Sequence, residues 1–274
     1  MKAKDNQFDL SNRVAIVTGG AGILGKQFCL TLAKNGAKVI LLDVNFDTAS
    51  QAASELLKIN EELSIYPLGC DVSKPEEVTN TVATIVEKFG SIDILHNNAA
   101  TKTSDLGDFF EPFESYKLST WQKVISVNLD GMFLMAQSVG NQMLKQLTPS
   151  SIIQTASVYG VVAPDQRIYK NSLYLDQKIN TPAVYVASKS AVIGLTRYLA
   201  AYWGKNNIRV NALTPGGIES GQNSTFTNLY SDRVPLGRMG RLDEMNSALL
   251  FLASDASSYV TGQNLIVDGG LTCW

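Results

Sequence analysis

The sequence alternates between short apolar runs and longer segments of helical periodicity, and this order constrains the fold more than any other feature. The runs are hydrophobic at successive positions, which is typical of strands covered on both faces. They lie at residues 14–18, 38–43, 65–71, 92–96, 151–155, 208–213 and 264–268. Helical segments lie between them, at 22–34, 47–60, 75–89, 120–146, 183–203 and 243–253. We therefore expect an α/β fold, a three-layer sandwich with a doubly wound, seven-stranded parallel sheet.

Three long connections interrupt this alternation, at 101–118, 158–182 and 216–235. Each follows a predicted strand, so we expect all three at the carboxyl edge of the sheet, where open α/β sheets bind ligands. Two helix starts carry capping-box spacing, Ser73 with Glu76 and Ser119 with Gln122. No repeat or linker divides the chain, and we expect a single domain over 1–274.

Composition excludes several classes of protein. A formal net charge of −2 gives no electrostatic footprint for nucleic acid. No apolar stretch approaches a membrane span, and residues 1–11 lack the apolar region of a secretory signal. The three cysteines and the lone His96 are too widely spaced for a metal site. We expect a cytoplasmic protein with no metal, nucleic-acid or membrane partner.

A glycine-rich loop follows the first predicted strand and reads Thr-Gly-Gly-Ala-Gly-Ile-Leu-Gly at 18–25. Glycine lets the backbone turn tightly and approach a pyrophosphate, and the next helix offers free N–H groups and a partial positive charge. Glycines also serve ordinary turns, but the position between the first strand and the first helix favours a Rossmann-like dinucleotide site. The expected contacts are Gly19, Gly22, Ile23, Leu24 and Gly25.

Asp43 ends the second predicted strand, at the position where an acidic residue can select the cofactor. Its carboxylate can accept hydrogen bonds from both ribose hydroxyls of NAD, and its charge would repel the 2′-phosphate of NADP. No basic residue in 44–46 favours the phosphate. The alternative is a solvated acid at a strand end. Together with the glycine loop, Asp43 favours NAD over NADP.

A candidate catalytic set falls on the later elements. Tyr185 and Lys189 stand at helical i,i+4 spacing, so their side chains share one helix face. A nearby ammonium would lower the pKa of the phenol and allow proton exchange with an alcohol. Ser157 ends the fifth predicted strand, and Asn128 lies within the predicted helix 120–146. Each has an ordinary explanation alone, but their order along the fold favours a catalytic site.

This combination resembles the short-chain dehydrogenase/reductase family in its common single-domain form. The resemblance covers residues 10–270. It includes the glycine loop, Asn128, Ser157 and the Tyr-x-x-x-Lys pair. The other matching motifs are Cys-Asp-Val at 70–72, Asn-Asn-Ala-Ala at 97–100, Asn-Ala-Leu-Thr-Pro-Gly at 211–216, Pro-Leu-Gly-Arg at 235–238 and Val-Asp-Gly-Gly at 267–270.

The resemblance implies a role for each matching residue. Tyr185 would be the acid/base, and Lys189 would hold the nicotinamide ribose and tune the phenol. Ser157 would position the substrate oxygen, and Asn128 would relay protons through water. The remaining cofactor contacts implied are Asp71, Val72, Asn98, Ala99, Pro215, Gly216, Ile218 and Ser220. The resemblance also implies a homo-oligomer, a tetramer or a dimer, whereas His96 is expected to be a core residue.

Besides Ala100 in Asn-Asn-Ala-Ala and Ser220 in place of a threonine, two departures from the family pattern stand out. Its glycine motif has the spacing TGxxGxxG rather than TGxxxGxG. The segment between Ser157 and Tyr185 is also longer than usual, and it carries Arg167, Lys170 and three tyrosines. Arg167 could bind a substrate carboxylate or phosphate, and the tyrosines could stack on a sugar. The alternative is a rigid flap or a subunit contact.

These observations favour an NAD-dependent oxidoreductase that interconverts a secondary alcohol and a carbonyl. We expect a sugar or an anionic polyhydroxy compound as substrate. An alternative is a ketoreductase of the 3-oxoacyl-carrier-protein type that uses NAD(P)H, although Asp43 disfavours NADPH. A third hypothesis, a dinucleotide-sensing protein without turnover, is disfavoured by the intact catalytic set.

Overall fold

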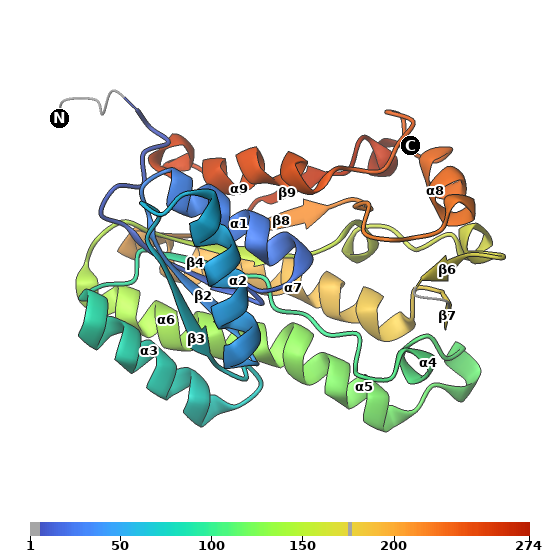
Figure 1. Ribbon diagram of the computed structural model, residues 1–274, viewed down its shortest axis with the longest axis horizontal. Helices are drawn as coiled ribbons and strands as arrows, with labels where there is room; N and C mark the ends of the chain where they lie inside the picture. The colour runs from blue at the N-terminus through green and yellow to red at the C-terminus, as the bar shows by residue number, and fades with distance from the viewer. Residues whose placement is uncertain (1–5, 175–176) are drawn as a thin grey trace.

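Seven parallel strands form the centre of the molecule in the computed structural model, which describes residues 6–174 and 177–274 (Figure 1). Their order across the sheet is β3-β2-β1-β4-β5-β8-β9. The strands are β1 Val14–Thr18, β2 Lys38–Asp43, β3 Ile65–Gly69, β4 Ile94–Asn97, β5 Ser150–Thr155, β8 Ile208–Pro215 and β9 Asn264–Val267. The order reverses between β1 and β4, which creates the crevice where such sheets bind ligands.

Helices cover both faces of this sheet. The longer ones are α1 Ile23–Lys34, α2 Phe46–Ile59, α3 Pro75–Phe89, α6 Met132–Gln146, α7 Ala183–Trp203 and α9 Asn246–Ala253. Helices α1, α2 and α9 bury apolar side chains against one face, and α3, α6 and α7 against the other. The predicted Rossmann-like, three-layer α/β fold is therefore confirmed. In the described part of the chain, no helix is both long enough and apolar enough to cross a membrane.

Two helix starts differ from the predicted capping boxes. Helix α3 begins at Pro75, which lacks an N–H and already has a helical φ, so Lys74 is the cap and its side chain makes no cap bond. The Ser73 hydroxyl instead donates to the carboxylate of Asp71 at 2.6 Å. The next helix, α5 Leu118–Ile125, begins before Ser119, which leaves that serine inside the helix.

The predicted helix 120–146 is three consecutive helical pieces. Between α5 and α6, residues Ser126–Gly131 form a π-helical segment. Such segments widen the helix locally and are frequent at functional sites. Asn128 lies within this segment and is fully buried.

All three long connections contain structure that the sequence pattern does not reveal. Segment 158–182 forms a small antiparallel hairpin from β6 Leu173–Tyr174 and β7 Gln177–Lys178. The other short helices, α4 Leu106–Phe109 and α8 Ser224–Ser231, lie in or beside the first and third connections. Figure 1 shows these three segments gathered at one end of the molecule, the right-hand side of the view.

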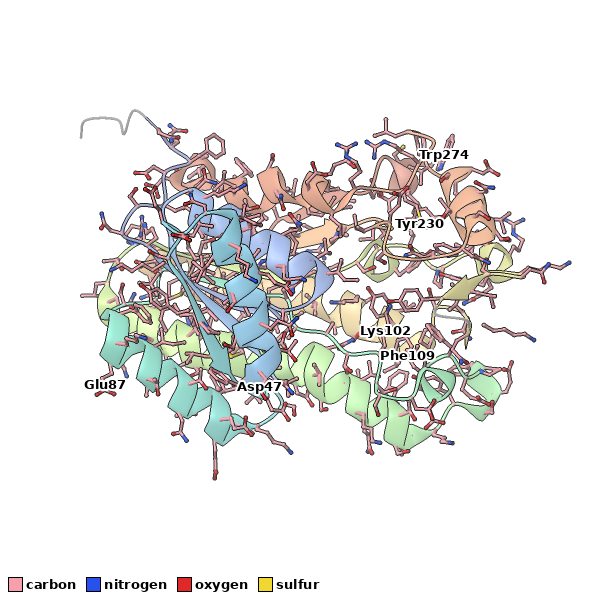
Figure 2. All side chains as sticks on the ribbon, viewed as in Figure 1. Asp47, Glu87, Lys102, Phe109, Tyr230 and Trp274 are labelled. Carbon is pink, nitrogen blue, oxygen red and sulfur yellow. The ribbon has the colours of Figure 1, made fainter. Side chains whose placement is uncertain are left out.

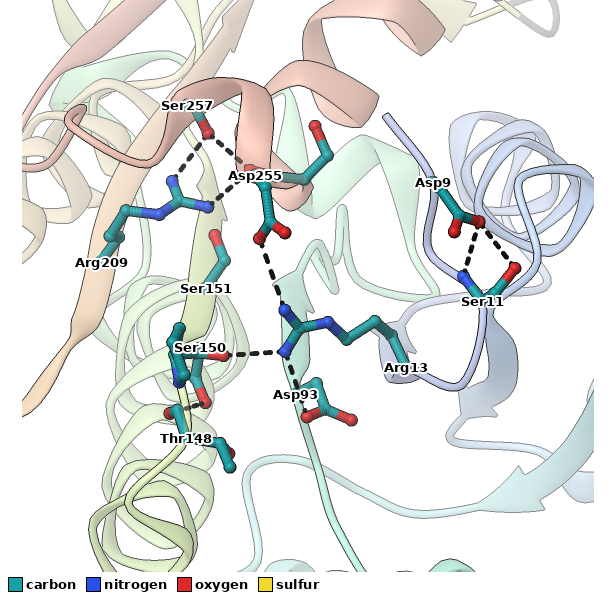
Figure 3. Close-up of polar contacts among 12 residues, drawn as sticks. Asp9, Ser11, Arg13, Asp93, Thr148, Ser150, Ser151, Arg209, Asp255 and Ser257 are labelled. Carbon is teal, nitrogen blue, oxygen red and sulfur yellow. Dashed lines mark hydrogen bonds and ion pairs between the residues drawn. The ribbon is translucent and has the colours of Figure 1, made fainter. Parts of the chain in front are cut away.

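The amino edge of the sheet is closed by two arginines (Figure 3). Arg13 lies 3.5 Å from the carboxylate of Asp93 and 3.4 Å from that of Asp255. Arg209 donates to the Ser257 hydroxyl at 2.8 Å and to the main-chain carbonyls of Leu252 and Ser254. These bonds tie the end of α9 and the residues after it to the amino ends of β1 and β8.

Candidate active site

The glycine loop between β1 and α1 brings backbone into close contact. A Cβ on Gly25 would lie 2.1 Å from the carbonyl oxygen of Gly19, so only glycine fits there. Gly19 has a φ of 62°, in the left-handed region that favours glycine. Gly22 caps α1 without a side-chain bond, and the first turn contains no acidic residue. The N–H groups of this helix end therefore remain available to an anion.

A cavity of about 420 Å³ adjoins this loop. Asp43 lies in its wall, where one carboxylate oxygen accepts a 3.1 Å hydrogen bond from the Ala21 N–H. The predicted adenosine-side residues all line the same cavity, namely Gly19, Gly22, Ile23, Leu24, Gly25, Asp43, Asp71, Val72, Asn98 and Ala99. No lysine or arginine is among the described lining residues. These features fit a dinucleotide without a 2′-phosphate. The helix end offers N–H groups, the glycines leave room for the pyrophosphate, and the second carboxylate oxygen of Asp43 can accept from a ribose hydroxyl.

Thr18 holds the loops of β1 and β4 together. Its hydroxyl oxygen accepts hydrogen bonds from the N–H groups of Asn98 and Ala99, each at 2.9 Å. The Asn98 amide in turn donates to the Thr18 carbonyl at 3.1 Å. Sequence reasoning missed Thr18, although its place just before the glycine loop was visible. The threonine fixes the crevice between the two strands.

Tyr185, Ser157 and Lys189 line a second cavity of about 600 Å³. Pro215, Gly216, Ile218 and Ser220 line it as well, and it shares Ile23, Leu24 and Asn98 with the first cavity. The structure thus brings Ser157, Tyr185 and Lys189 into the same cavity as the predicted nicotinamide-side residues, whereas Asn128 is not among the described residues that line either cavity. A dinucleotide can extend from the glycine loop to Tyr185.

Burial controls the ionisation of Tyr185 and Lys189. Desolvation lowers the pKa of Lys189 to about 8, and the ammonium donates to the Thr155 carbonyl at 2.7 Å. Desolvation also raises the pKa of Tyr185, against an opposing hydrogen bond with Ser157. The expected lowering by Lys189 is therefore wrong for this structure. Its ammonium lies 5.9 Å from the ring centroid of Tyr185, and the loss of solvent outweighs its charge.

A hydrogen bond from the backbone fixes the side chain of Asn128. Its amide oxygen accepts a 2.8 Å hydrogen bond from the Thr101 N–H, at the start of the first long connection. Its amide nitrogen is buried and has no hydrogen-bond partner within the described residues. An unpaired buried donor is unfavourable unless water or a ligand satisfies it. The geometry suits a residue that holds an ordered water.

The insertion does not present Arg167 to either cavity. The side chain of Arg167 is 90% exposed and its guanidinium bonds to the carboxylate of Asp165 at 2.7 Å. Asp165 also contacts Arg233, which ties the insertion to the segment after α8. Lys170 is exposed as well. The expectation that Arg167 binds a substrate anion is corrected, because a nearby carboxylate on its own loop already neutralises it.

The tyrosines of the insertion, by contrast, do line the larger cavity. Tyr169 contacts the hydroxyls of Thr181 at 2.5 Å and Tyr159 at 3.2 Å. Apolar side chains of the insertion, including Ile168, pack with Phe226 of α8. The insertion is therefore both a packed flap and a wall of the cavity.

Several lining residues lay outside the sequence prediction. Lys102, Asn180 and Gln222 line the larger cavity, one from each of the three long connections. Tyr230 of α8 also lines it, and its hydroxyl accepts a 2.5 Å hydrogen bond from the Gly217 N–H. The sequence predicts that the connections carrying these residues lie at the carboxyl edge of the sheet, but no motif marks the individual residues.

The fold and the cavities define a nucleotide-dependent oxidoreductase of small molecules. A family model described as enoyl-(acyl carrier protein) reductase matches residues 20–272. An NAD-dependent glycerol dehydrogenase of Listeria innocua is 34% identical, over 99% of this chain and 98% of that relative. A 3-oxoacyl-[acyl-carrier-protein] reductase of Thermotoga maritima is 35% identical, over 96% and 98%.

A solved short-chain dehydrogenase of Leptospira borgpetersenii with bound NAD+ superposes with a TM-score of 0.85 at 31% identity, over 99% of this chain and 97% of that one. The chain therefore belongs to the short-chain dehydrogenase/reductase family. It is an enzyme of that family, as the sequence motifs predicted.

Proposed function

We propose that this protein is an NAD-dependent dehydrogenase that oxidises a secondary alcohol of a polyhydroxylated small molecule to a carbonyl. The observation that carries the proposal is that Ser157, Tyr185 and Lys189 meet in one cavity beside a nucleotide cradle walled by Asp43. The similarity to an NAD-dependent glycerol dehydrogenase supports both the cofactor and the polyol class.

The catalytic roles follow from the positions of the side chains. A bound oxidised nicotinamide would supply the hydride acceptor and a positive charge in the cavity. Ser157 donates a hydrogen bond to the substrate oxygen, and Tyr185 accepts the proton of the alcohol. Because burial raises the pKa of Tyr185, the phenol must first lose a proton. We assign to Asn128, whose buried amide donor is unpaired, the water through which that proton leaves, and to the Lys189 ammonium the nicotinamide ribose.

We assign the cofactor contacts to the residues around the two cavities. The glycine loop at 18–25 holds the pyrophosphate, and Asp43 accepts hydrogen bonds from the adenosine ribose. Asp71, Val72, Asn98 and Ala99 surround the adenosine half, and Pro215, Gly216, Ile218 and Ser220 the nicotinamide half. NADP is less favoured, because its phosphate would meet the Asp43 carboxylate and no lining cation among the described residues.

A second candidate function is reduction of a 3-oxoacyl group carried on acyl carrier protein. The similarity to the Thermotoga reductase favours it. Such a reaction runs the same proton transfer in reverse, and the protonated phenol of Tyr185 is suited to donate to a carbonyl. Asp43 favours NAD over NADP, and this preference supports oxidation of an alcohol rather than reduction of a 3-oxoacyl group with NADPH.

We further propose a single-domain, cytoplasmic enzyme that forms a homotetramer or homodimer. Three unpaired cysteines agree with a reducing compartment. Tyr198 and Tyr202 stack on the exposed side of α7 with ring centroids 5.7 Å apart, and Phe133 of α6 is also exposed. Exposed aromatic groups of this kind favour a protein interface.

The test is NADH formation, followed by absorbance, with purified protein and a panel of polyols, sugars, sugar acids and simple alcohols. Tyr185→Phe is the matched variant, and Tyr259→Phe, on a fully exposed ring, is its control. We expect turnover by the parent and the control, and a loss of about 10²–10⁴-fold in Tyr185→Phe with NADH binding retained. No NADH with any substrate, or equal rates in Tyr185→Phe, would overturn the proposal.

A further inference from the structure

The charged side chains described in the lining of the larger cavity are all positive. Among its described lining residues, the charged side chains are Lys102 and Lys189, and no aspartate or glutamate lines it. Lys189 is already bonded to the Thr155 carbonyl and has a catalytic role in the proposed function. Lys102 therefore supplies a positive charge that the proposed chemistry does not use.

Lys102 lies over an aromatic ring contributed by the insertion. Its ammonium is 4.1 Å from the ring centroid of Tyr174, within the range of a cation–π contact. It makes no hydrogen bond or ion pair with the residues the structure describes. The side chain remains accessible to solvent through the open cavity, while surrounding protein lowers its pKa by desolvation. The Tyr174 ring covers one side of the Lys102 ammonium, and the other N–H donors of this ammonium are available to a ligand.

Tyr174 is itself fixed by two neighbouring segments. It pairs with Gln177 in the small hairpin and forms a backbone bridge with Gln222 in the third long connection. The Asn223 N–H also donates to the Leu173 carbonyl at 3.3 Å. Lys102 comes from the first long connection, so three distant segments meet around Tyr174. Figure 2 labels Lys102 and Phe109, which both line this cavity.

We propose that Lys102, positioned by Tyr174, binds a carboxylate of the substrate, and that the enzyme oxidises a polyhydroxy carboxylic acid. This inference rests on the proposed function and specifies its substrate class. A cavity with an uncommitted cation and no described carboxylate favours an anion over a neutral polyol. One ammonium without a guanidinium or a second uncommitted cation suits a singly charged carboxylate better than a doubly charged phosphate. The amides of Asn180 and Gln222 offer neutral partners for hydroxyls.

The experiment compares substrates that differ only in charge. Initial rates with NAD are measured on a six-carbon aldonate, on the neutral alditol of equal length, and on the phosphate monoester of that alditol. The proteins are the parent, Lys102→Gln, Lys102→Arg and Tyr174→Leu. Lys170→Gln is the matched control, because Lys170 is an exposed lysine in the insertion that does not line the cavity. Binding of the aldonate and the alditol to the NAD-loaded proteins is measured separately by calorimetry.

We expect the parent to have the highest kcat/KM on the aldonate. Lys102→Gln should lower the ratio of aldonate to alditol efficiency by about tenfold or more, mainly through KM, since a charge-assisted bond is lost. Lys102→Arg should recover part of the ratio, Tyr174→Leu should lower it less, and Lys170→Gln should leave it unchanged. Calorimetry should give the same order of affinities.

Two kinds of result overturn the inference. A parent that prefers the alditol or the phosphate ester, or a Lys102→Gln ratio equal to that of the parent, contradicts carboxylate binding while the dehydrogenase function stands. If no substrate is oxidised, the proposed function fails. Calorimetry then decides the binding inference alone: weaker aldonate binding in Lys102→Gln supports it, and equal binding in both proteins rejects it.

Discussion

The ammonium of Lys189 donates a 2.7 Å hydrogen bond to the main-chain carbonyl of Thr155, the last residue of β5. This bond joins the first turns of α7, which carry Tyr185, to the strand end that leads to Ser157. Lys189 is 2% exposed, so the bond is protected from water. The distance between the proposed acid/base and the proposed substrate-orienting hydroxyl thus depends on a lysine whose printed hydrogen bond goes to neither of them.

Replacing Lys189 should lower turnover strongly while it changes the free energy of unfolding only modestly. Lys189→Met removes the desolvated charge and the tie to Thr155 while it keeps most of the side-chain volume. We expect turnover to fall by about 100-fold or more. The unpaired carbonyl destabilises by about 1–3 kcal/mol, but removal of a buried charge offsets part of this. Rates and thermal unfolding are compared with Lys205→Met, an exposed lysine just beyond α7. Full activity in Lys189→Met would contradict the assignment.

Asp43 should determine the choice between NAD and NADP. In Asp43→Asn the amide oxygen can still accept the hydrogen bond from Ala21, so the loop is preserved and the negative charge is removed. We expect the NAD to NADP ratio of kcat/KM to fall by about tenfold. Asp47→Asn, on the exposed first turn of α2, is the control and should keep the parent ratio. An unchanged ratio in Asp43→Asn would mean that another residue selects the cofactor.

Two glycines that look alike in the sequence should respond in opposite ways to alanine. A Cβ on Gly25 would meet the Gly19 carbonyl at 2.1 Å, whereas a Cβ on Gly194 of α7 meets nothing within 4 Å. Gly25→Ala must displace the loop, so we expect weaker NADH binding and a lower Tm. Gly194→Ala should raise the free energy of unfolding by up to about 1 kcal/mol, since alanine favours the helix. Fluorescence titration with NADH and thermal unfolding measure both effects. Equal behaviour of the two variants would show that the loop is not constrained as described.

The sequence predicted the sheet well because its strands are covered on both faces. The runs at 14–18 and 38–43 match β1 and β2 at both ends, since continuous hydrophobicity stops where each strand leaves the two helical layers. The glycine loop was equally visible, because Gly25 is required by a contact within the loop itself. Local chemistry and local contacts were sufficient for both features.

The walls of the larger cavity could not be predicted in the same way. The hairpin strands are two residues long, too short to show periodicity, and Tyr174 is bridged to Gln222 far along the chain. Lys102 and Arg167 are both cations in long connections, and only the fold reveals that Arg167 pairs with Asp165 while Lys102 faces the cavity. Asn128 lies in a π-helical segment that helical periodicity reads as ordinary helix.

The lone histidine makes the stability of the protein depend on pH in a defined window. His96 is fully buried, its ring lies 4.5 Å from that of Phe28, and its Nε2 shares a 2.8 Å hydrogen bond with Thr155. Burial lowers its pKa to about 3, compared with about 6.5 in an unfolded chain. Between these values the unfolded state binds more protons than the native state. The free energy of unfolding therefore rises with pH across the window and falls as the pH drops below about 6.5.

The measurement is the free energy of unfolding in denaturant between pH 5 and pH 7, at one fixed protein concentration. Because the sequence has one histidine, no other side chain of ordinary pKa titrates near 6.5. The parent should show a slope that approaches about 1.4 kcal/mol per pH unit toward pH 5. His96→Gln keeps a polar partner for Thr155 but cannot be protonated, so its slope should be close to zero between pH 5.5 and pH 7, even if its stability is lower throughout. Parallel curves for the two proteins would mean that His96 ionises as readily in the native state as in the unfolded chain.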